Sequence, residues 1–395
     1  MASTLMNTAP RPIRLLMLSH YFEERRGGIE FVAAALARQL AEQGFSLVWL
    51  ATGEARSGAE DSSCRRSALA ASSVAERFLH VPYPLLLPSA WRAIFREAAR
   101  SDVILVHDAL YMTSLIAFAA ARVHRKPLVI IQHIGLVPYR NGVLRRLMQG
   151  ANRCVAAPLL RGADRVVFIS QLTQQYFAQI RWRRAPALVF SGVDTRVFSP
   201  AFGDAAVESA RTNLGLPVDA PIALFVGRFV EKKGLRVLEI LARMRPDVLF
   251  TFAGDGPLDP RRWALPNVRV YRGLSGSTLA PLYRASDVLL LPSAGEGFPL
   301  VVQEALASGL MVVCGADTAR ADPGATRLLN SIEVDLAKPD ETAGRLSEAL
   351  THVLAQPLSE SEQRVRLEFA RESYSWAMSA AKYAAILREL RARAA

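Results

Sequence analysis

The stretch "VLLLPSAGEGFPLVVQEAL" (residues 288–306) contains the unit from which the fold is built. Its first residues are continuously apolar, which is typical of a strand buried on both faces of a parallel sheet. "LVVQEALASG" then predicts a helix near 301–308, so "AGEG" is the loop at the carboxyl end of the strand. Ligands of open parallel sheets bind outside the carboxyl ends of the strands. This loop is therefore predicted to line a binding crevice.

The same alternation of apolar runs and helical stretches occupies most of the chain. The other strands are predicted at 13–19, 45–52, 103–108, 127–133, 165–170, 187–192, 221–227, 248–256, 268–273 and 310–315. Helices fit between them, for example near 112–124, 234–245, 276–286 and 340–355. Continuous apolar strands separated by helices predict an α/β fold with two Rossmann-like parallel-sheet domains.

The domain boundary is predicted near 191–204, where Pro and Gly interrupt the pattern. We expect an N-terminal domain over 1–198, a C-terminal domain over 199–376 and a last amphipathic helix over 377–395. Residues 54–75 are rich in Ser and Ala and are expected to form a flexible excursion. The dinucleotide fingerprint GxGxxG is absent, because "GDGPLD" does not match it.

Composition and cysteine use exclude several protein classes. The chain has 395 residues, 51% of them hydrophobic and 21% charged, which is too apolar for a disordered protein. Its cysteines, Cys64, Cys154 and Cys314, are far apart, and no His cluster has metal-ligand spacing. Neither a disulfide framework nor a structural zinc is expected, and a reducing cytosol fits. No apolar run reaches about 18 residues and no signal peptide is recognisable, so we expect a cytoplasmic protein without a transmembrane helix.

The net charge of +12 is distributed unevenly. Residues 1–200 contain 25 Lys and Arg against 13 Asp and Glu, an excess of 12, whereas residues 201–395 contain 23 of each. A one-sided basic field favours attraction to an anionic membrane leaflet, a nucleic acid or a phosphorylated substrate. The alternative is that the excess serves solubility alone.

Two carboxylates, Glu296 and Glu304, flank the apolar run of the opening stretch. Glu296 lies in the loop, and Glu304 lies about one turn into the helix and leans back toward its start. The backbone N–H groups at that helix start form an anion site. Carboxylates on either side would repel the anion but would accept hydrogen bonds from sugar hydroxyls. The alternative is that both are solvated charges favoured by the helix dipole.

Basic residues and glycines follow other predicted strands. Arg228, Lys232 and Lys233 stand in "VGRFVEKKG" (226–234), and such cations suit a diphosphate. The alternative is a basic surface loop. In the first half, "ERRGGIE" places Gly27 and Gly28 before a helix, which allows close approach to a ligand. His133 ends a strand and faces the crevice; His107 and His20 are weaker candidates, and a lone His is more often structural.

These motifs together resemble those of the retaining glycosyltransferases of family 4, which have the GT-B fold. The matching pieces, in the family's order, are "GGIE" (27–30), His133, "ADRVVFIS" (163–170), "SGVDTRVFSP" (191–200), "GRFVEKKG" (227–234), "FAGDGPL" (252–258), "YRASDVLLLPS" (283–293) and the Glu296–Glu304 pair. The resemblance implies two domains that face a central cleft. It also implies that the last helix crosses back to the N-terminal domain.

The resemblance further implies a nucleoside-diphosphate sugar as donor, UDP- or GDP-linked, held mainly by the C-terminal domain. Arg228 and Lys233 would hold the diphosphate, Glu304 the ribose, and Glu296 the donor sugar. His133 and the Gly28 loop would reach the donor from the N-terminal domain. The expected catalytic residues are His133 and Glu296, and the expected donor-binding residues are Gly28, Gly227, Arg228, Lys233, Gly297, Phe298, Pro299, Leu300 and Glu304.

The implied reaction is transfer of a hexose-type sugar to a glycan or lipid-linked acceptor, in the synthesis of a surface polysaccharide, lipopolysaccharide or glycolipid. Retention would follow front-face attack, and fixed cations and helix dipoles would stabilise the leaving diphosphate, so no cofactor or metal is expected. The chain departs from the family at Ser191, where Asn is frequent, and after Cys314, where a Gly-rich loop is usual. The alternatives are a sugar-nucleotide epimerase or hydrolase of the same fold and a non-catalytic nucleic-acid-binding protein.

Two stretches, 88–100 and 139–165, are both basic and apolar. Each is predicted either to lie on an anionic membrane surface or to pack its apolar face on its own sheet. In the first case Trp91, Ile94 and Phe95 of the first stretch would face the bilayer. The charge excess favours a peripheral enzyme on the inner face of the cell membrane, whose charge reversal at Arg145 and Arg146 would abolish liposome binding.

Overall fold

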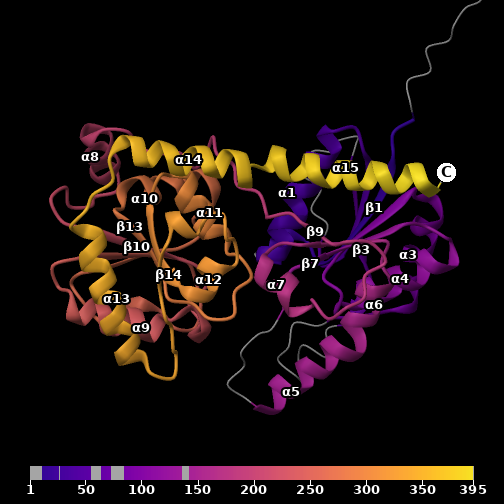
Figure 1. The fold of residues 1–395 in the computed structure, drawn as a ribbon, viewed down its shortest axis with the longest axis horizontal. Helices are drawn as coiled ribbons and strands as arrows, with labels where there is room; N and C mark the ends of the chain where they lie inside the picture. Colours follow the sequence, from indigo (N-terminus) through magenta and orange to yellow (C-terminus); the bar gives the residue numbers. More distant parts are fainter. Residues whose placement is uncertain (1–10, 26, 55–63, 73–83, 136–141, 395) are drawn as a thin grey trace, which may run out of the picture.

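The computed structural model describes residues 11–25, 27–54, 64–72, 84–135 and 142–394, which form two α/β domains side by side (Figure 1). The N-terminal sheet has the order β3-β2-β1-β6-β7-β8-β9, and the C-terminal sheet has the order β12-β11-β10-β13-β14-β15. All pairings within these two sheets are parallel. The expected architecture of two parallel-sheet domains is confirmed.

The N-terminal sheet is covered on both faces. Its strands are β1 (Arg14–Tyr21), β2 (Ser46–Thr52), β3 (Cys64–Leu69), β6 (Val103–His107), β7 (Leu128–Gln132), β8 (Arg165–Phe168) and β9 (Ala187–Leu188). One face packs on α1 (Gly28–Glu42) and α15 (Trp376–Ala394), and the other on α3 (Pro88–Arg100), α4 (Met112–Val123) and α6 (Ala157–Gly162). Because both faces are buried, the central strands are apolar throughout.

The shorter elements of this domain connect these layers. They are η1 (Glu23–Arg25), the antiparallel pair β4 (Ala71–Ser72) and β5 (Leu85–Leu86), α5 (Gly142–Ala151), the π-helical turn η2 (Asn152–Ala156) and α7 (Gln171–Tyr176). Helix α5 extends away from the sheet and continues through η2 into α6 (Figure 1).

The C-terminal domain has the same layered arrangement. Its strands are β10 (Ile222–Val226), β11 (Leu249–Ala253), β12 (Val268–Tyr271), β13 (Val288–Leu291), β14 (Met311–Gly315) and β15 (Asn330–Ile332). Its helices are α8 (Asp204–Asn213), α9 (Leu235–Met244), α10 (Ala280–Ala285), α11 (Leu300–Ala307), α12 (Ala316–Arg320), α13 (Pro339–Leu354) and α14 (Glu360–Tyr374), with 3₁₀ turns η3 (Glu231–Lys233), η4 (Pro260–Trp263), η5 (Gly276–Thr278) and η6 (Thr326–Leu328). One continuous apolar cluster fills this domain.

Helices α14 and α15 run along one side of both domains (Figure 1). Tyr374 at the end of α14 belongs to the C-terminal core, whereas Tyr383, Leu387 and Leu390 of α15 belong to the N-terminal core. These three apolar positions recur every three or four residues, so they share one helix face. The chain therefore crosses between the domains a second time at Ser375, where Val193 forms an isolated parallel bridge with it.

Two expectations need correction. Residues 64–72 are not a flexible excursion, because Cys64–Leu69 is the edge strand β3, which pairs with β2. This strand is half-exposed and polar, and Arg65 and Arg66 make ion pairs with Glu97 and Glu23, so its sequence has no apolar run. Residues 55–63 and 73–75 of that stretch lie outside the described residues.

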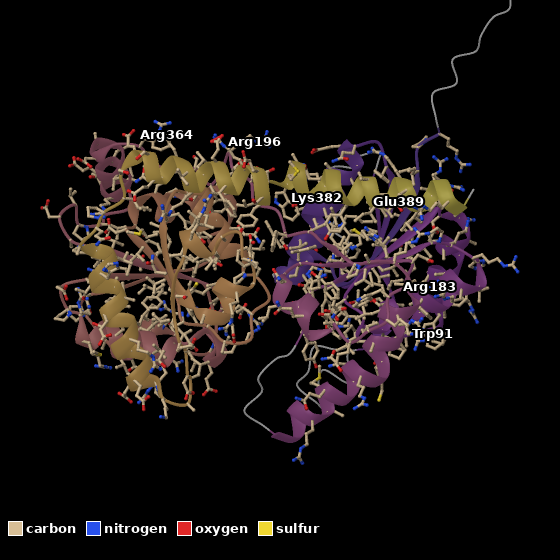
Figure 2. The ribbon with its side chains drawn as sticks, in the orientation of Figure 1. Trp91, Arg183, Arg196, Arg364, Lys382 and Glu389 are labelled. Carbon is tan, nitrogen blue, oxygen red and sulfur yellow. The ribbon has the colours of Figure 1, made fainter. Side chains whose placement is uncertain are left out.

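Helix α3 does not offer its apolar face to a membrane. Ile94 is fully buried in the domain core, and Phe95 packs against the same cluster. Trp91 is the exposed member, at 45% (Figure 2). In the second basic stretch Leu147 is 67% exposed on α5, whereas residues 139–141 and the side chain of Arg145 lie outside the described parts. Among the described helices, none is both long and apolar enough to cross a bilayer.

Candidate active site

The predicted site residues gather where the strand order of each sheet reverses. In the C-terminal sheet this point lies between β10 and β13, whose following loops carry Arg228 and Glu296. In the N-terminal sheet it lies between β1 and β6, and His133 follows the adjacent strand β7. Such switch points are where ligands of doubly wound sheets bind.

Direct contacts bring the loops of the two domains together. Gly297 lies so close to the N-terminal domain that a Cβ there would be 3.3 Å from the backbone oxygen of His133 and 3.8 Å from Oγ1 of Thr173. Nearby, the N–H of Gln171 donates to the oxygen of Ala321 at 2.9 Å. The β13–α11 loop of the C-terminal domain thus meets the loops after β7 and β8 of the N-terminal domain, at the place where the resemblance implies the cleft.

Glu296 forms ion pairs with both lysines of the β10 loop. Its Oε2 is 3.1 Å from Nζ of Lys233, and its Oε1 is 3.5 Å from Nζ of Lys232. Burial acts to raise the pKa of Glu296, but the two lysines together lower it below its usual value. Burial lowers the pKa of Lys233, and the Glu296 carboxylate opposes that shift. The cations and the carboxylate predicted on separate loops therefore form one charged cluster.

Close backbone contacts hold these two loops in place. Gly234 has a φ of 76°, and a Cβ there would be 2.3 Å from the backbone oxygen of Pro292. Only glycine fits this left-handed position against a neighbouring backbone. The N–H of Ala294 also donates to the oxygen of Lys232 at 3.0 Å. Arg228 has an exposed side chain, and the preceding Gly227, which directly follows β10, has a φ of 152°.

Glu304 is surrounded differently from Glu296. The hydroxyl of Tyr283 donates to its Oε2 at 2.6 Å, and burial raises its pKa to about 7. Neither carboxylate is therefore an ordinary solvated charge, and the solvated alternative does not hold. Tyr283 is a site residue that the sequence analysis missed; its position in "YRASD", just before the strand, is the signal that would have identified it.

The turn before α11 combines a buried side chain with a free helix end. The Phe298 ring lies between Phe190 and Tyr374, with centroids 5.6 and 5.4 Å away, so its side chain is structural. Pro299 precedes the first helical residue, Leu300, and no side chain caps this N-terminus. The backbone N–H groups at the start of α11 remain suited to an anion or a polar ligand.

His133 forms a buried pair with His107. Nδ1 of His107 and Nε2 of His133 are 3.0 Å apart, and both side chains are buried. Burial lowers the pKa of His133 to about 3. The pKa of His107 is also lowered, mainly by burial and to a smaller extent by the neighbouring His133. Both rings are neutral near pH 7, so one donates to the other. The Nδ1 of His133 is the ring nitrogen left for a ligand.

Asp108 fixes the loop that carries His133. It has a φ of 65°, and its Oδ2 accepts from the N–H of Ile134 at 3.1 Å and from Nε2 of Gln132 at 3.2 Å. Burial raises the pKa of Asp108 to about 6. The sequence analysis did not assign Asp108, although its place directly after the strand "VILVH" was a usable signal.

Gly28 begins α1, and its Cα faces open space. The neighbouring Gly27 is crowded, because a Cβ there would be 2.0 Å from Oε2 of Glu30. The Glu30 carboxylate, a third group that the sequence analysis did not assign, therefore lies at the positive end of the α1 dipole. Among the described residues, no group of three His, Cys, Asp or Glu is arranged to hold a metal ion.

Two family models match the chain, one in each domain. Residues 26–197 match the model described as glycosyltransferase family 4, and residues 220–355 match glycosyl transferases group 1. The D-inositol 3-phosphate glycosyltransferase of Kineococcus radiotolerans is 29% identical over 306 residues, which cover 70% of this chain and 69% of that protein. For further curated relatives with the same name, the match spans about half of each relative's length.

Solved structures share the fold over nearly the whole chain. Sucrose-phosphate synthase from Thermosynechococcus elongatus superposes with a TM-score of 0.72 at 19% identity, covering 96% of this chain and 100% of that one. Anabaena HepE in complex with UDP and glucose superposes with a TM-score of 0.71 at 18% identity, covering 95% and 100%. The chain therefore has the same fold as these two structures.

Proposed function

Because this chain belongs to glycosyltransferase family 4 and has the GT-B fold, we propose that it transfers a hexose-type sugar from a nucleoside-diphosphate sugar to a glycan or lipid-linked acceptor, with retention at the anomeric carbon. The observation that carries the proposal is the cluster of Lys232, Lys233 and Glu296 at the switch point of the C-terminal sheet. A nearby exposed arginine, Arg228, supplies a planar fork for a phosphate.

Each group has a chemical task in this reaction. The donor diphosphate is held by Arg228 and Lys233, and the start of α11 adds its dipole. Glu304, with Tyr283 on one oxygen, accepts hydrogen bonds from the ribose. Glu296 and the backbone from Gly297 to Leu300 orient the donor sugar. His133, held neutral, contacts the sugar from the N-terminal domain.

Chemistry proceeds on the front face of the sugar. The bond between the anomeric carbon and the diphosphate oxygen breaks as the acceptor oxygen bonds to the same face of that carbon. The acceptor proton passes to the leaving phosphate oxygen. Fixed cations stabilise the negative charge that develops on the diphosphate, so no metal or other cofactor is part of the proposal.

The acceptor belongs to surface polysaccharide, lipopolysaccharide or glycolipid synthesis in this proposal, and the enzyme works on the cytoplasmic side of the membrane. Support comes from the basic N-terminal half and from Leu147, which is exposed on α5. The membrane contact is tested by flotation of the full chain with vesicles that contain anionic lipid, comparing wild type with Arg145→Glu/Arg146→Glu. Equal flotation of both proteins would remove the contact from the proposal.

The donor assignment is tested by thermal shift of the purified chain with UDP, GDP, ADP, dTDP and their sugar conjugates, without added metal. UDP is the first choice, because Anabaena HepE was solved with UDP-glucose. A ligand at about 100 times its Kd stabilises the native state by roughly 2.7 kcal/mol, which gives a clear shift.

The matched control is Arg228→Ala, which truncates an exposed side chain and therefore should leave the stability of the free protein nearly unchanged. We expect one nucleotide to stabilise the wild type and to lose most of its effect on Arg228→Ala. A response to no nucleotide at all, from protein that unfolds cooperatively, would contradict the proposal and leave the non-catalytic alternative.

A further inference from the structure

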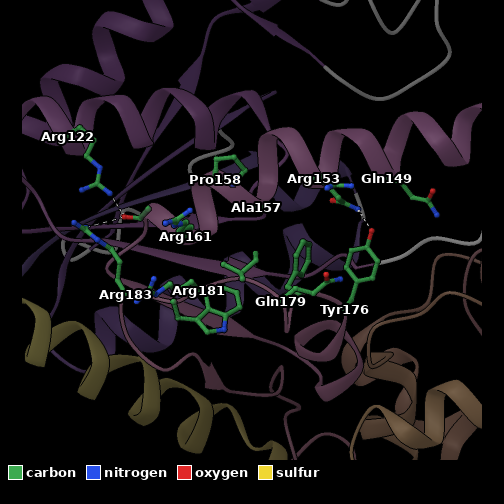
Figure 3. Close-up of a pocket in the computed structure, with 15 residues that line it drawn as sticks. Arg122, Gln149, Arg153, Ala157, Pro158, Arg161, Tyr176, Gln179, Arg181 and Arg183 are labelled. Atoms are coloured by element: carbon green, nitrogen blue, oxygen red, sulfur yellow. Dashed lines mark hydrogen bonds between the residues drawn. The ribbon is translucent and has the colours of Figure 1, made fainter.

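A second concave site lies in the N-terminal domain, outside the charged cluster of the cleft. It is a groove of about 1120 Å³, bordered by Arg122 at the end of α4, by the segment α5–η2–α6 and by residues 176–183 (Figure 3). Pockets for compact small molecules have volumes of about 300–1,000 Å³. The groove is therefore large enough for an extended ligand.

Five arginines line this groove: Arg122, Arg153, Arg161, Arg181 and Arg183. Among the described residues that line it, none is acidic. Arg183 pairs with Asp164 at 3.2 Å, and both Arg183 and Arg122 donate to the backbone oxygen of Gly162. Arg153, Arg161 and Arg181 are exposed and have no ion-pair partner within the described part of the chain. These guanidinium groups are available to an anionic ligand.

The sequence around the groove is the source of the charge excess of the protein. Between residues 122 and 184 there are 12 Lys and Arg and a single acidic residue, Asp164. This stretch alone accounts for a net charge of +11, against +12 for the whole chain. Nearly all of the excess therefore comes from the segments that form the groove and their immediate neighbours, as expected if it serves a local ligand rather than solubility.

The two ends of the groove differ in chemistry. Figure 3 shows Arg122, Arg161, Arg181 and Arg183 toward one end, and Gln149, Tyr176, Gln179 and the single arginine Arg153 toward the other. At the second end Asn152 is 6% exposed, and its Nδ2 donates to the Tyr176 hydroxyl at 3.3 Å.

The Oδ1 of Asn152 is buried and has no hydrogen-bond partner among the described residues. A buried acceptor without a partner is costly, and a ligand hydroxyl would satisfy it. Amides, a phenol and the half-exposed ring of Trp182 are groups that contact sugar hydroxyls and sugar faces.

The Tyr176 end of the groove lies close to the cleft. Helix α7 begins beside Ala321 and Gly297 of the C-terminal domain and ends at Tyr176. A Cβ on Gly135, two residues after His133, would be 3.6 Å from Cβ of Tyr176. A chain whose reacting end lay in the cleft would thus meet the amide end of the groove, with Arg153, first and the other four arginines farther out.

We propose that this groove binds an acidic glycan, the part of the acceptor chain that lies behind its reacting end. Neutral sugar units contact Asn152, Gln149 and Tyr176, and carboxylate or phosphate groups on the following units pair with Arg161 and Arg181. The inference rests on the proposed function, since it names the class of acceptor. A bilayer surface is flat and fits a concave site poorly. Stacking platforms for nucleic-acid bases would need more exposed aromatics than Tyr176 and Trp182, since Phe177, the third aromatic of the described lining, is buried.

The test is calorimetric titration of the full chain, without nucleotide, with an oligogalacturonate as the acidic glycan and a maltooligosaccharide of the same length as the neutral one. We expect the oligogalacturonate to bind at least tenfold more tightly, and salt to weaken its binding. Arg161→Glu/Arg181→Glu should weaken it at least tenfold. The charge-matched control is Arg38→Glu/Arg92→Glu, which changes two exposed arginines of the same domain outside the groove and should leave the affinity within twofold.

Three results would overturn the inference. The first is no binding of oligogalacturonate by the wild type, and the second is equal weakening of that binding in both double variants. The third is that the wild type binds anionic vesicles or RNA instead of the glycan and that Arg161→Glu/Arg181→Glu loses this binding. The thermal shift with UDP is recorded on the same preparations. Glycan binding without any nucleotide response would support the inference about the groove and contradict the proposed transferase function. A nucleotide response without glycan binding would do the reverse.

Discussion

The carboxylates Glu296 and Glu304 stand on the same strand–loop–helix unit but have opposite electrostatic surroundings. Glu296 is ionised because two lysines face it, whereas Glu304 is half-buried against a neutral phenol, and desolvation raises its pKa to about 7. An acid whose pKa is raised in the folded state favours the protonated form, so its ionisation costs stability as the pH rises through that value. Glu304, which we propose to bind the ribose, is thus poised to titrate near neutral pH.

This pKa predicts a pH dependence of nucleotide binding. An ionised Glu304 accepts two hydroxyl hydrogen bonds, whereas the protonated acid accepts them poorly, so UDP affinity should increase between pH 6 and 8. The Kd of Glu304→Gln should change little over that range and should exceed the wild-type Kd at pH 8 by roughly tenfold. Titration calorimetry at several pH values checks this; parallel pH profiles for both proteins would contradict it.

The raised pKa of Glu304 also predicts that the stability of the wild type falls as the pH rises, whereas its UDP affinity increases. Above pH 7 the wild type carries a buried carboxylate that Glu304→Gln lacks, so the free energy of unfolding of the variant should improve relative to wild type as pH rises from 5 to 8. Urea unfolding at both pH values measures the difference. A constant difference would mean that Glu304 titrates at its ordinary value.

Helices α14 and α15 and the 190–193 segment form the two chain crossings between the domains. The N–H of Val193 donates to the oxygen of Tyr374 at 2.7 Å, and Oγ of Ser379 donates to the oxygen of Phe190 at 3.0 Å. The crossings are in contact at one more point, where the ring of Trp376 lies directly against Gly192. Any relative motion of the domains must therefore bend both segments at the same place.

We predict that position 192 requires glycine because no room is left there for a larger residue. A Cβ at this position would be 2.2 Å from Cδ2 of Trp376, so Gly192→Ala should displace the indole and cost about 1–3 kcal/mol of unfolding free energy. The control is Gly344→Ala in α13, where a Cβ meets nothing within 4 Å, and which should gain about 0.5–1 kcal/mol from helix propensity. Urea unfolding followed by tryptophan fluorescence compares them; equal stability of the two variants would refute the packing argument.

The whole molecule is two domains joined by these crossings and by a few contacts over the cleft. The contacts at Gln171 and Gly297 are short and involve backbone atoms on both sides. Each domain has its own apolar core, and α15 belongs to the N-terminal one. The separation of the domains therefore depends on close approach at a small number of positions.

A bulkier residue at Gly297 should push the domains apart. A Cβ at this position would already be 3.3 Å from the backbone oxygen of His133 and 3.8 Å from Oγ1 of Thr173. Gly297→Val adds two methyl groups to that Cβ, so the neighbouring domain must move away. Small-angle scattering should show a larger radius of gyration than for wild type, and UDP affinity should fall. Gly344→Val, far from the cleft, is the control and should leave the scattering curve unchanged. Identical curves for all three proteins would show that this contact does not set the domain separation.

Local pattern by itself determined the α/β class and the positions of the long central strands. The run "VLLLPS" and its equivalents are apolar throughout because they are buried on both faces, so their sequence carries the signal. The strand-end positions of Arg228, Glu296 and His133 followed from the same pattern, since carboxyl ends of parallel strands share one edge of a sheet.

Tertiary structure decided everything that depends on which distant residues meet. The polar edge strand β3 exists because β2 pairs with it, and Ile94 is buried because α3 packs on its own sheet. His107 and His133, 26 residues apart, pair because β6 and β7 are neighbours. The arginine groove likewise unites Arg122 with Arg181, which no local periodicity connects. Short-range pattern reports how each segment is buried, whereas charge pairing and site composition arise only when the chain brings separate segments together.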